Sequence, residues 1–487
     1  MSDQATAHSS VHSLKSVPRP SEKRVPSSSP TASPNSIVGK DLASPQPVPF
    51  SAHFFDGSEA VARKAYLKAL IGGCFLVIVA IFGVFSIYWG SLWRTPVTTF
   101  PGWVVDFDGG IVGQAVVRDL TTSAPPAVPS RIVWTAVPAS QFPGGPQQVG
   151  NAVVEQHSWI AVSILSGSSK SLEACYISPN STYNGSAVMT VYASEARNEN
   201  AYRVILRPAV QSQLGSISQQ FALQAIPALQ SDNAINMTAL LNTSPQTVLT
   251  PIGYIIDNLV PFDEPVATAV TFVGLIYQLI LAFFVVMIAF GAREVSGLNM
   301  SLTLPSLITL RLVSSFLAYF IVSLFYALLS LAFKLSFTRK FGSSGFVIFW
   351  MLNWLGMLST GLALEALITI LTPKYIPFFM ILWIIVNVSV AAYPIEVLPS
   401  IYRYGYAVPF YNLSHASRCI VFGAKNTVGM NFSILIIWTA ISCVTLPLIQ
   451  WFVRRKDVQE VQAKTQRSPR GLEATTDTHT LQPGRNI

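Results

Sequence analysis

A single carboxylate stands where an ionised side chain is hardest to accommodate. Glu365 lies within the apolar run Phe346–Leu371, and an ionised carboxylate in the hydrocarbon of a membrane is costly and therefore usually functional. It is about six residues from the end of that run, or ~9 Å along a helix, so it can also reach water or pair locally. Glu365 is thus a candidate for proton coupling, and a structural role is the alternative.

A second polar group follows the second apolar run. Arg293 and Glu294 are followed by GLNMSLTLPSL, in which Leu298, Leu302 and Leu304 are interleaved with polar residues. This spacing is typical of a short amphipathic helix that lies on a membrane or contacts a partner. An ordinary loop with side chains that reach the interface explains the same residues. Arg293 and Glu294 therefore begin a candidate segment for contact with the membrane surface or a partner, with the loop as the alternative.

Two acidic residues follow a predicted strand in WVVDFDGGIVG. Asp106 and Asp108 are separated by one residue, so on a strand both carboxylates point to the same side. Such a pair can bind a cation. A strand that ends in an Asp-Gly turn is the more common explanation.

Four glycosylation sequons lie between residues 95 and 265. They begin at Asn180, Asn184, Asn236 and Asn242. Matching triplets in or near apolar runs begin at Asn299, Asn387, Asn412 and Asn431. The first four are glycosylation candidates and agree with an exoplasmic location, and unmodified surface asparagines are the alternative.

The sequence contains no catalytic or metal-binding pattern. GxxxxGK[ST], GxSxG, HExxH and CxxC are all missing, which predicts no enzyme, no cofactor and no metal site. Cys74 and Cys443 lie in apolar runs. Cys175 and Cys419 can form a bridge only if both are outside the cell and close together, and two free thiols are the alternative.

Composition indicates a membrane protein. The 487 residues include 51% hydrophobic and 11% charged side chains, whereas a soluble domain has about 25% charged residues. The net charge of +8 comes from basic residues clustered in the tails and beside the apolar runs. This distribution predicts contact with the lipid bilayer and not with nucleic acid.

The first apolar run is predicted to be a transmembrane helix over residues 66–93. Three basic residues flank its start and two tryptophans stand near its end: Arg63, Lys64, Lys68, Trp89 and Trp93. This order is typical of a helix that leaves the cytosol. Residues 1–62, rich in Ser and Pro, are predicted to be a disordered cytosolic tail.

Residues 95–265 are predicted to form a mixed α/β extracytoplasmic domain. Short apolar stretches between Gly, Pro, Ser and Asn predict its strands. They are WVVDF, RIVWTAV, WIAVSIL, AVMTVYA and YRVILRP. From Val210 onward, VQSQLGSISQQFALQAIPALQ has the longer spacing of a helix.

Residues 266–453 are predicted to hold five more spans, which makes about six transmembrane helices in a polytopic α-helical membrane protein. The runs are Val266–Phe290, Leu312–Phe333, Phe346–Leu371, Ile376–Ala392 and Phe432–Val453. Arg454, Arg455 and Lys456 end the last run and predict a cytosolic C-terminus, with residues 454–487 as a second disordered tail. The basic linker with Lys334, Arg339 and Lys340, which this topology places outside, is an exception.

Polar and proline residues divide this membrane region further. Gln278, Asn353 and Asn387 lie within the runs, where interhelical hydrogen bonds explain them. The connection from Tyr393 to Gly423 is too apolar for a free loop. It is predicted to form interfacial or re-entrant short helices, broken at the three prolines Pro394, Pro399 and Pro409.

Four segments together resemble the fungal membrane-protein family named for nitrosoguanidine resistance. They are YWGSLWR, VVDFDGGIVGQA, VGLIYQLILAFF and YPIEVLPSIYRYGYAVPFYN. That family is similar in turn to the membrane domains of type-2 ABC exporters, in which a coupling helix joins helices two and three and short re-entrant helices precede helix six. AREVSGLNMSLTLPS and PFYNLSHASRCIVFG occupy those positions in this chain, so the resemblance implies that Arg293 and Glu294 belong to a coupling segment.

The resemblance implies a plasma-membrane protein that confers tolerance to toxic small molecules by taking part in their export. Because the chain has no ATPase motif, it implies a cytosolic ATPase, a membrane partner or a homodimer as further components. The alternative is a non-transporting regulator or scaffold of membrane lipid organisation.

Overall fold

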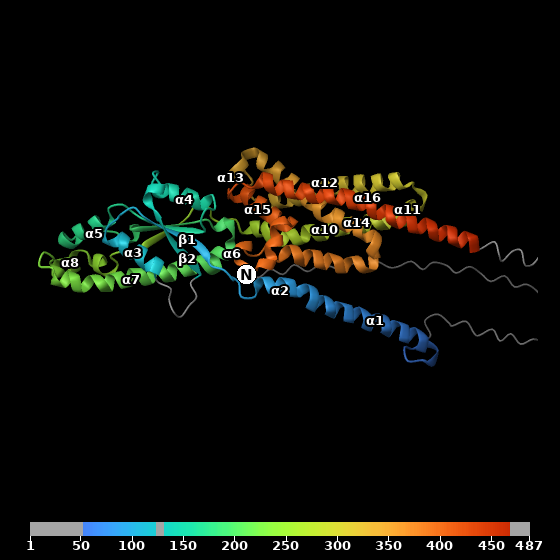
Figure 1. The fold of residues 1–487 in the computed structure, drawn as a ribbon, viewed down its shortest axis with the longest axis horizontal. Helices are drawn as coiled ribbons and strands as arrows, with labels where there is room; N and C mark the ends of the chain where they lie inside the picture. Colours follow the sequence, from blue (N-terminus) through green and yellow to red (C-terminus); the bar gives the residue numbers. More distant parts are fainter. Residues whose placement is uncertain (1–51, 123–130, 468–487) are drawn as a thin grey trace, which may run out of the picture. The chain divides into compact units, whose positions relative to one another are not determined.

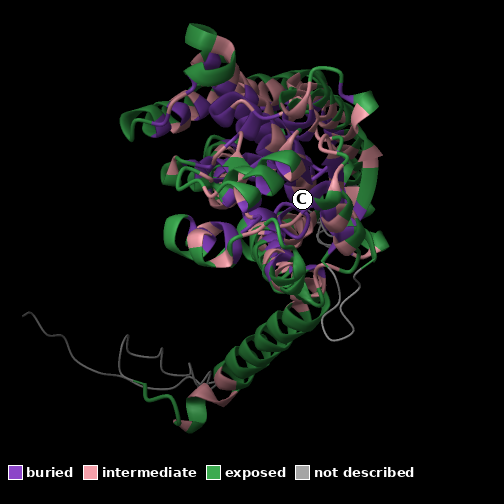
Figure 2. Ribbon diagram, turned by 90° about the vertical axis from the view of Figure 1, so that its left-hand side faces the viewer, coloured by how far each residue is buried: buried purple, intermediate pink, exposed green. Residues whose placement is uncertain are grey.

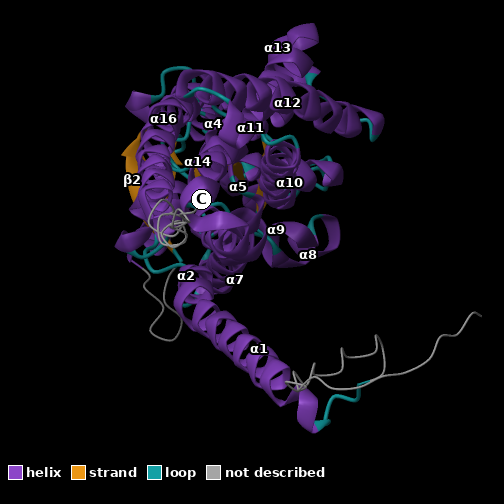
Figure 3. Ribbon diagram, turned by 90° about the vertical axis from the view of Figure 1, so that its right-hand side faces the viewer, coloured by secondary structure: helices purple, strands orange, loops and turns teal. Residues whose placement is uncertain are grey.

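The computed structural model describes residues 52–122 and 131–467. Residues 1–51 and 468–487, most of the two predicted tails, lie outside this part. The chain divides into two units, Met1–Ile71 and Gly72–Ile487. Helices make up most of the described residues, and Figure 3 shows them in purple, with the strands of the five-stranded sheet in orange largely behind them.

The sheet has mixed direction. Its strands are β1 (Phe100–Asp106), β2 (Ile132–Pro138), β3 (Ile160–Ile164), β4 (Met189–Ala193) and β5 (Tyr254–Asn258), in the order β2-β1-β3-β4-β5. β1 is parallel to β2 and β3, β4 is antiparallel to β3, and β5 is parallel to β4. The first four strands confirm the strand predictions, whereas β5 was not predicted.

Helices cover both faces of the sheet. α4 (Pro146–Val154) lies on one face, and α3 (Ile111–Thr122) and α7 (Arg207–Ser231) lie on the other (Figure 1). The adjacent residues Val104 and Val105 are both fully buried, in different hydrophobic clusters, because successive side chains of a strand point to opposite faces. We call β1–β5 and their helices the sheet domain. Its remaining α-helices are α5 (Ser168–Ile177), α6 (Glu199–Ala201), α8 (Met237–Thr243) and α9 (Pro245–Leu249).

The predicted strand YRVILRP is wrong. Tyr202–Leu206 is helical and continues into α7. The side chain of Asn198 accepts a hydrogen bond from the Ala201 backbone N–H at 2.9 Å and so begins this helical stretch. A short apolar run has no periodicity that separates a buried helix from a strand.

Among the described residues, five helical stretches are long and apolar enough to cross a membrane. They are Gly57–Leu92, Pro265–Val295, Leu304–Ala332, Thr338–Val388 and Val428–Glu460. Their main helices are α1 (Ala60–Ala80), α2 (Ser86–Leu92), α10 (Gly274–Val295), α12 (Leu304–Ala332), α14 (Gly345–Val388) and α16 (Val428–Arg467). Their length and hydropathy make the chain a polytopic helical membrane protein. Figure 2 shows α1 as exposed over most of its length, and α1 has no buried residue.

The fourth and fifth predicted spans form one helical element, α14. Thr372 within α14 has the non-helical angles φ 61° and ψ 164°. It precedes a proline, whose ring disfavours the helical conformation of the residue before it. The two predicted runs are therefore parts of one helical element, separated only by a local break at Thr372.

The direction of α14 reverses at this break. In a straight helix Gly356 and Asn387 would be about 46 Å apart, at ~1.5 Å per residue. However, Asn387 Oδ1 accepts a hydrogen bond from the Phe410 backbone N–H at 3.1 Å, and a Cβ added to Gly356 would lie 2.8 Å from Leu413. The two halves of α14 therefore reach the same short part of the chain.

The connection before α16 contains the predicted short helices. The 3-10 helices η10 (Ile395–Val397) and η11 (Ser400–Ala407) and the helix α15 (Pro409–Phe422) follow or begin at the three prolines. All residues of α15 except Tyr411 and His415 are buried. This segment is a packed part of the protein, as its apolar composition predicts.

Both predicted tails are shorter than expected where the structure describes them. A 3-10 turn forms at Gly57–Glu59 and α1 begins at Ala60, within the predicted 1–62 tail. α16 continues to Arg467, so residues 454–467 of the predicted 454–487 tail are helical. The segment RRKDVQEVQAKTQR has neither Gly nor Pro and is rich in strong helix formers.

Polar groups also join the membrane helices. Gln278 Nε2 on α10 donates a hydrogen bond to the Asn353 backbone carbonyl on α14 at 2.7 Å. The Tyr319 hydroxyl on α12 donates to the Ala282 carbonyl on α10 at 3.2 Å. The predicted interhelical role of Gln278 is confirmed, and that of Asn387 is confirmed by its bond to Phe410.

Replacement of Gly361 by alanine tests the close packing of α12 and α14. A Cβ at Gly361 would lie 2.3 Å from the hydroxyl of Tyr319, which is fully buried. We expect Gly361→Ala to lower the free energy of unfolding by about 1–3 kcal/mol, as overpacking does. Thermal unfolding of the purified protein in detergent measures this change. Gly291→Ala on α10, with no atom within 4 Å of the added Cβ, is the control, and equal stability of the two variants would contradict the prediction.

Candidate functional site

The candidate site is a buried ion triad among the membrane helices. Glu365 Oε1 on α14 lies 2.9 Å from Arg293 Nη2 on α10 and 2.7 Å from Arg311 Nε on α12. The Glu365 side chain is 0% exposed, and those of Arg293 and Arg311 are 7% and 3% exposed. One carboxylate therefore holds two cations and joins three helices.

Arg311 extends this group to a fourth helix. Its Nη1 donates hydrogen bonds to Thr369 Oγ1 at 2.9 Å and to Gln450 Oε1 on α16, and its Nη2 donates to the backbone carbonyl of Glu365. The planar guanidinium carries its donors in fixed directions. Arg311 can thus bind α14 and α16 at the same time.

The position of Arg311 differs from the sequence prediction. Arg311 directly precedes the predicted run Leu312–Phe333, so the predicted transmembrane helix did not include it. In the structure α12 begins at Leu304, with Pro305 in its first turn, so Arg311 lies two turns inside the helix. The proline was the available signal, because proline is favoured in the first turn of a helix.

The triad leaves part of its hydrogen-bonding capacity unused. Glu365 Oε2 is buried and has no hydrogen-bond partner among the described residues. Removal of one partner from a buried ion pair typically costs about 3–5 kcal/mol, because the remaining charge is left without compensation.

Of the two predicted coupling residues, the structure brings Arg293 to Glu365, whereas Glu294 is exposed and accepts a hydrogen bond from Asn299.

The predicted amphipathic segment forms one separate helical turn, and its last residues, from Leu304 on, begin α12. α11 (Leu298–Ser301) follows Gly297, whose φ of 68° favours glycine. Arg454 on α16 donates hydrogen bonds to the backbone carbonyls of Asn299 and Leu302, both at 2.6 Å. We call residues 296–303 the linker.

The linker and the triad line the same cavity. Its volume is about 180 Å³, and its lining includes Arg293 and Arg311 of the triad, Asn299 and Met300 of the linker, and Arg454. Met300 is 73% exposed. The triad is therefore close to the surface on the side where the linker lies.

The four candidate sequons are accessible. Asn180, Asn184, Asn236 and Asn242 are all exposed. Asn184 and Asn236 accept backbone hydrogen bonds through Oδ1, from Ser186 and Ala239. These bonds do not involve Nδ2, the atom to which a glycan is attached. By contrast, the matching triplets in the membrane region begin at buried asparagines, which are Asn387, Asn412 and Asn431, or at the half-buried Asn299.

The acidic pair in WVVDFDGGIVG shapes a turn. Asp106 Oδ1 accepts hydrogen bonds from the backbone N–H groups of Asp108 and Gly109, at 2.8 and 3.0 Å. Asp108 accepts from the Ser169 backbone N–H at 2.9 Å and from the Ser169 hydroxyl. Burial alone raises the pKa of Asp108, but these hydrogen bonds outweigh it, and the pKa is lowered. The Asp-Gly turn is therefore the interpretation that the contacts support.

The cysteines are free in the structure. Cys175 is half-buried on α5, and Cys419 is buried on α15. Burial raises the pKa of both thiols. Of the two alternatives for Cys175 and Cys419, the structure has the unpaired thiols.

The spans and the buried triad define an integral membrane protein. The chain belongs to the family whose model is described as a protein of unknown function, DUF3533, and which matches residues 73–444. The chain is also 26% identical over 436 residues to the uncharacterized endoplasmic reticulum membrane protein YJR015W of Saccharomyces cerevisiae, with 84% of each chain covered. No solved structure matches the chain.

Replacement of Glu365 by glutamine tests the triad. We expect Glu365→Gln to lower the free energy of unfolding by about 3–5 kcal/mol, because two buried guanidinium groups lose their shared carboxylate. The measurement is thermal or denaturant unfolding of the full chain in detergent. Glu294→Gln, at an exposed carboxylate that lines the same cavity but lies outside the triad, should leave stability within about 0.5 kcal/mol of the parent. A stable Glu365→Gln variant would show that the triad does not hold the helices together.

Proposed function

We propose that the protein confers tolerance to toxic small molecules by taking part in their export, as a membrane component similar to those of type-2 ABC exporters. The observation that carries the proposal is the shared cavity of the linker and the buried triad. A displacement of the linker would act directly on Arg454 of α16 and, across the cavity, on the arginines of α10 and α12. Movement at the linker would thereby reach α16, α10 and α12 and, through Glu365, also α14.

The triad is suited to transmit movement of the linker to the membrane helices. Arg293 and Arg311 share a single carboxylate oxygen, and the second oxygen of Glu365 has no partner among the described residues. The cations can therefore exchange between the two oxygens without leaving the carboxylate. Coupling between distant sites is carried by packed groups that have two discrete arrangements. In this proposal the source of the force is a cytosolic ATPase or another membrane partner, because the chain has no nucleotide-binding motif.

The proposed topology has six crossings, with both termini in the cytosol and the sheet domain outside. The reversal of α14 at Thr372 supports it, since each half of α14 then crosses the membrane separately. This topology also places outside the basic segment with Lys334, Arg339 and Lys340, which is an exception to the positive-inside pattern. Arg339 forms ion pairs with Asp263 at 2.9 Å and Glu264 at 3.2 Å, so part of its charge is compensated on that side.

We place the protein in the plasma membrane, where export removes a toxic compound from the cell. The endoplasmic reticulum in the printed name of the yeast relative is the alternative compartment. Both membranes are compatible with the same topology, because the lumen and the cell exterior are equivalent sides. Microscopy of the tagged full chain against markers of the two membranes separates them.

A second candidate function is the organisation of membrane lipids without transport. This function is supported by the small size of the two cavities that are lined by buried charged side chains. The cavity beside the triad has about 180 Å³ and the one beneath the sheet domain about 170 Å³, whereas pockets for drug-sized ligands have about 300–1,000 Å³. Neither cavity holds such a compound without a change of conformation.

Efflux measurements distinguish the two functions. We expect cells with the protein to release a preloaded toxic dye or nitrosoguanidine-like compound at a saturable rate, before any change in the lipids exposed at the surface. Arg454→Gln should reduce this rate about fivefold or more, because it releases the linker carbonyls from α16. Lys456→Gln, at an exposed position two residues away, is the matched control. Altered lipid exposure with unchanged efflux would favour the second function.

Glycosylation tests the proposed topology. We expect glycosidase treatment of the protein from its host to lower its apparent mass, because at least one of Asn180, Asn184, Asn236 and Asn242 carries a glycan. Exchange of all four for glutamine should abolish the shift, and Asn299→Gln should leave it unchanged. A glycan on Asn299 would place the linker outside and would contradict the orientation.

A further inference from the structure

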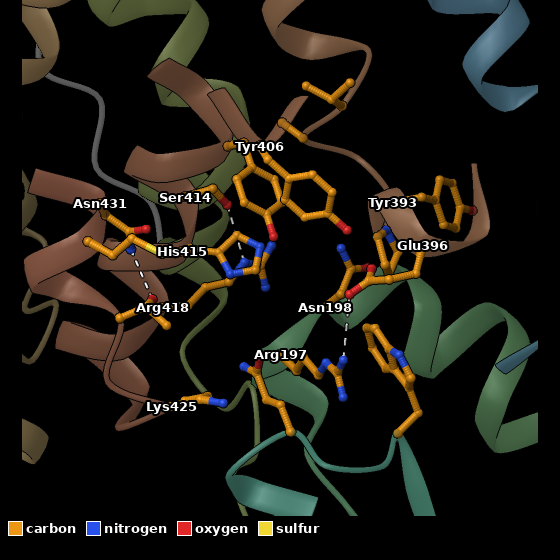
Figure 4. A pocket seen from close by; sticks show the side chains of 18 residues that line it. Arg197, Asn198, Tyr393, Glu396, Tyr406, Ser414, His415, Arg418, Lys425 and Asn431 are labelled. Carbon is orange, nitrogen blue, oxygen red and sulfur yellow. Dashed lines mark hydrogen bonds and ion pairs between the residues drawn. The ribbon is translucent and has the colours of Figure 1, made fainter. Parts of the chain in front are cut away.

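A second cavity lies where the sheet domain contacts the segment before α16. Its volume is about 170 Å³. Figure 4 shows side chains that come from both sides of this cavity, with Arg197 and Asn198 from the sheet domain and Tyr406, His415 and Arg418 from the other segment. Asn200 Nδ2 donates a hydrogen bond to the Ala392 carbonyl at 3.1 Å and helps to join the two parts.

The cavity has an excess of positive charge. Arg197, Arg418 and Lys425 line it, against one carboxylate, that of Glu396. Burial lowers the pKa of Arg197 to about 10, so this guanidinium stays charged at neutral pH. Behind the lining, Glu199 forms an ion pair with Arg418. Even with Glu199 included, the cations outnumber the carboxylates by one.

The cationic groups have donors that the protein does not use fully. Arg197 Nη1 donates to the Ser158 carbonyl at 3.1 Å, but its Nη2 is 3.8 Å from Glu396, beyond hydrogen-bond distance. Arg418 uses Nε and Nη1 for Ser414, Ala196 and Glu199, and within the described residues its Nη2 has no bond. Lys425 is half-buried, and no ion pair to it occurs in the described part of the chain.

Two further polar groups of the lining lack partners. Asn431 is fully buried, and its Oδ1 has no hydrogen bond among the described residues; as an acceptor it can accept a hydrogen bond from a headgroup hydroxyl or a protonated phosphate but supplies no donor to a phosphate oxygen. The His415 ring contacts Tyr411, with ring centres 4.1 Å apart, and makes no hydrogen bond there. Burial, followed by the nearby Arg418 and Arg197, lowers the pKa of His415 to about 3, so it is neutral and offers one N–H donor.

The rim of the cavity belongs to the edge of the membrane region. Met430 lines the cavity and is 58% exposed, and it lies in the first turn of the membrane helix α16. Tyr406, also in the lining, is 43% exposed, and tyrosines are enriched at membrane surfaces, where an apolar ring and a polar hydroxyl are both accommodated. A ligand that enters here meets buried cations at one end and an apolar helix at the other.

We propose that this cavity binds a phosphate-bearing group, presented as the headgroup of an anionic phospholipid. Two guanidinium groups and an ammonium supply the charge-assisted hydrogen bonds that phosphate oxygens accept. The volume suits a headgroup rather than a whole drug-sized molecule. The exposed apolar residues of α16 lie where the acyl chains would extend. The site is independent of export and would exist in either proposed function.

Lipid titration of the full-length protein in detergent tests the site. The probe is fluorescent phosphatidic acid, with phosphatidylcholine of the same acyl chains for comparison and inorganic phosphate as a competitor. We expect saturable binding of phosphatidic acid that is weakened about fivefold or more by Lys425→Gln and by Arg197→Gln. Lys425 has no ion pair among the described residues, so its replacement should leave the fold intact. Lys374→Gln, at an exposed lysine at the turn within α14, is the matched control for general attraction to anionic lipids.

Each outcome bears on the proposal. Binding of phosphatidic acid that depends on Lys425 but not on Lys374 supports a lipid headgroup site. If inorganic phosphate binds with the same dependence on Lys425 and displaces the lipid, the phosphate chemistry holds and the source is soluble. Equal losses in the Lys425 and Lys374 variants, or the absence of saturable binding for both probes, would overturn the proposal.

Discussion

Glu365 is a carboxylate that the membrane helices bury completely and that two guanidinium groups share. Each of the three charges would be costly in hydrocarbon alone, and the carboxylate offsets part of the charge of the two guanidinium groups only when α10, α12 and α14 are assembled. Arg311 adds α16 through Gln450. The arrangement of these helices therefore depends on an interaction that no one of them can complete.

A buried ion pair, that of Arg418 and Glu199, joins the sheet domain to α15. Beside it, within the sheet domain and the segment that follows β5, Glu195 accepts hydrogen bonds from Arg203 at 2.5 Å, from Asn258 at 2.7 Å and from the Phe262 backbone N–H at 3.1 Å. Burial alone raises the pKa of Glu199, but the charge of Arg418 outweighs it and lowers the pKa. The Arg418–Glu199 pair thus holds the two regions in contact, and Arg418 also lines the cationic cavity between them.

Close contact between helices depends on small residues at a few positions. Gly361 allows the ring of Tyr319 to approach α14, and Gly356 admits Leu413 of α15. Without a hydrophobic driving force between helices in lipid, such approach and interhelical hydrogen bonds supply much of the packing energy. They bring the Glu365 carboxylate within reach of both arginines.

Hydropathy and basic flanks were enough to predict a polytopic helical membrane protein, because a membrane requires long apolar helices whatever their neighbours are. Prolines predicted where η10, η11 and α15 begin, since proline acts on the local backbone. The identity of the partners of Glu365 could not be predicted. Arg293 and Arg311 are 72 and 54 residues away from it in sequence, and the predicted third apolar run began at Leu312, directly after Arg311. The reversal of α14, the helical conformation of YRVILRP and the cationic cavity were also decided by tertiary contacts, because burial and pairing depend on segments that are distant in the chain.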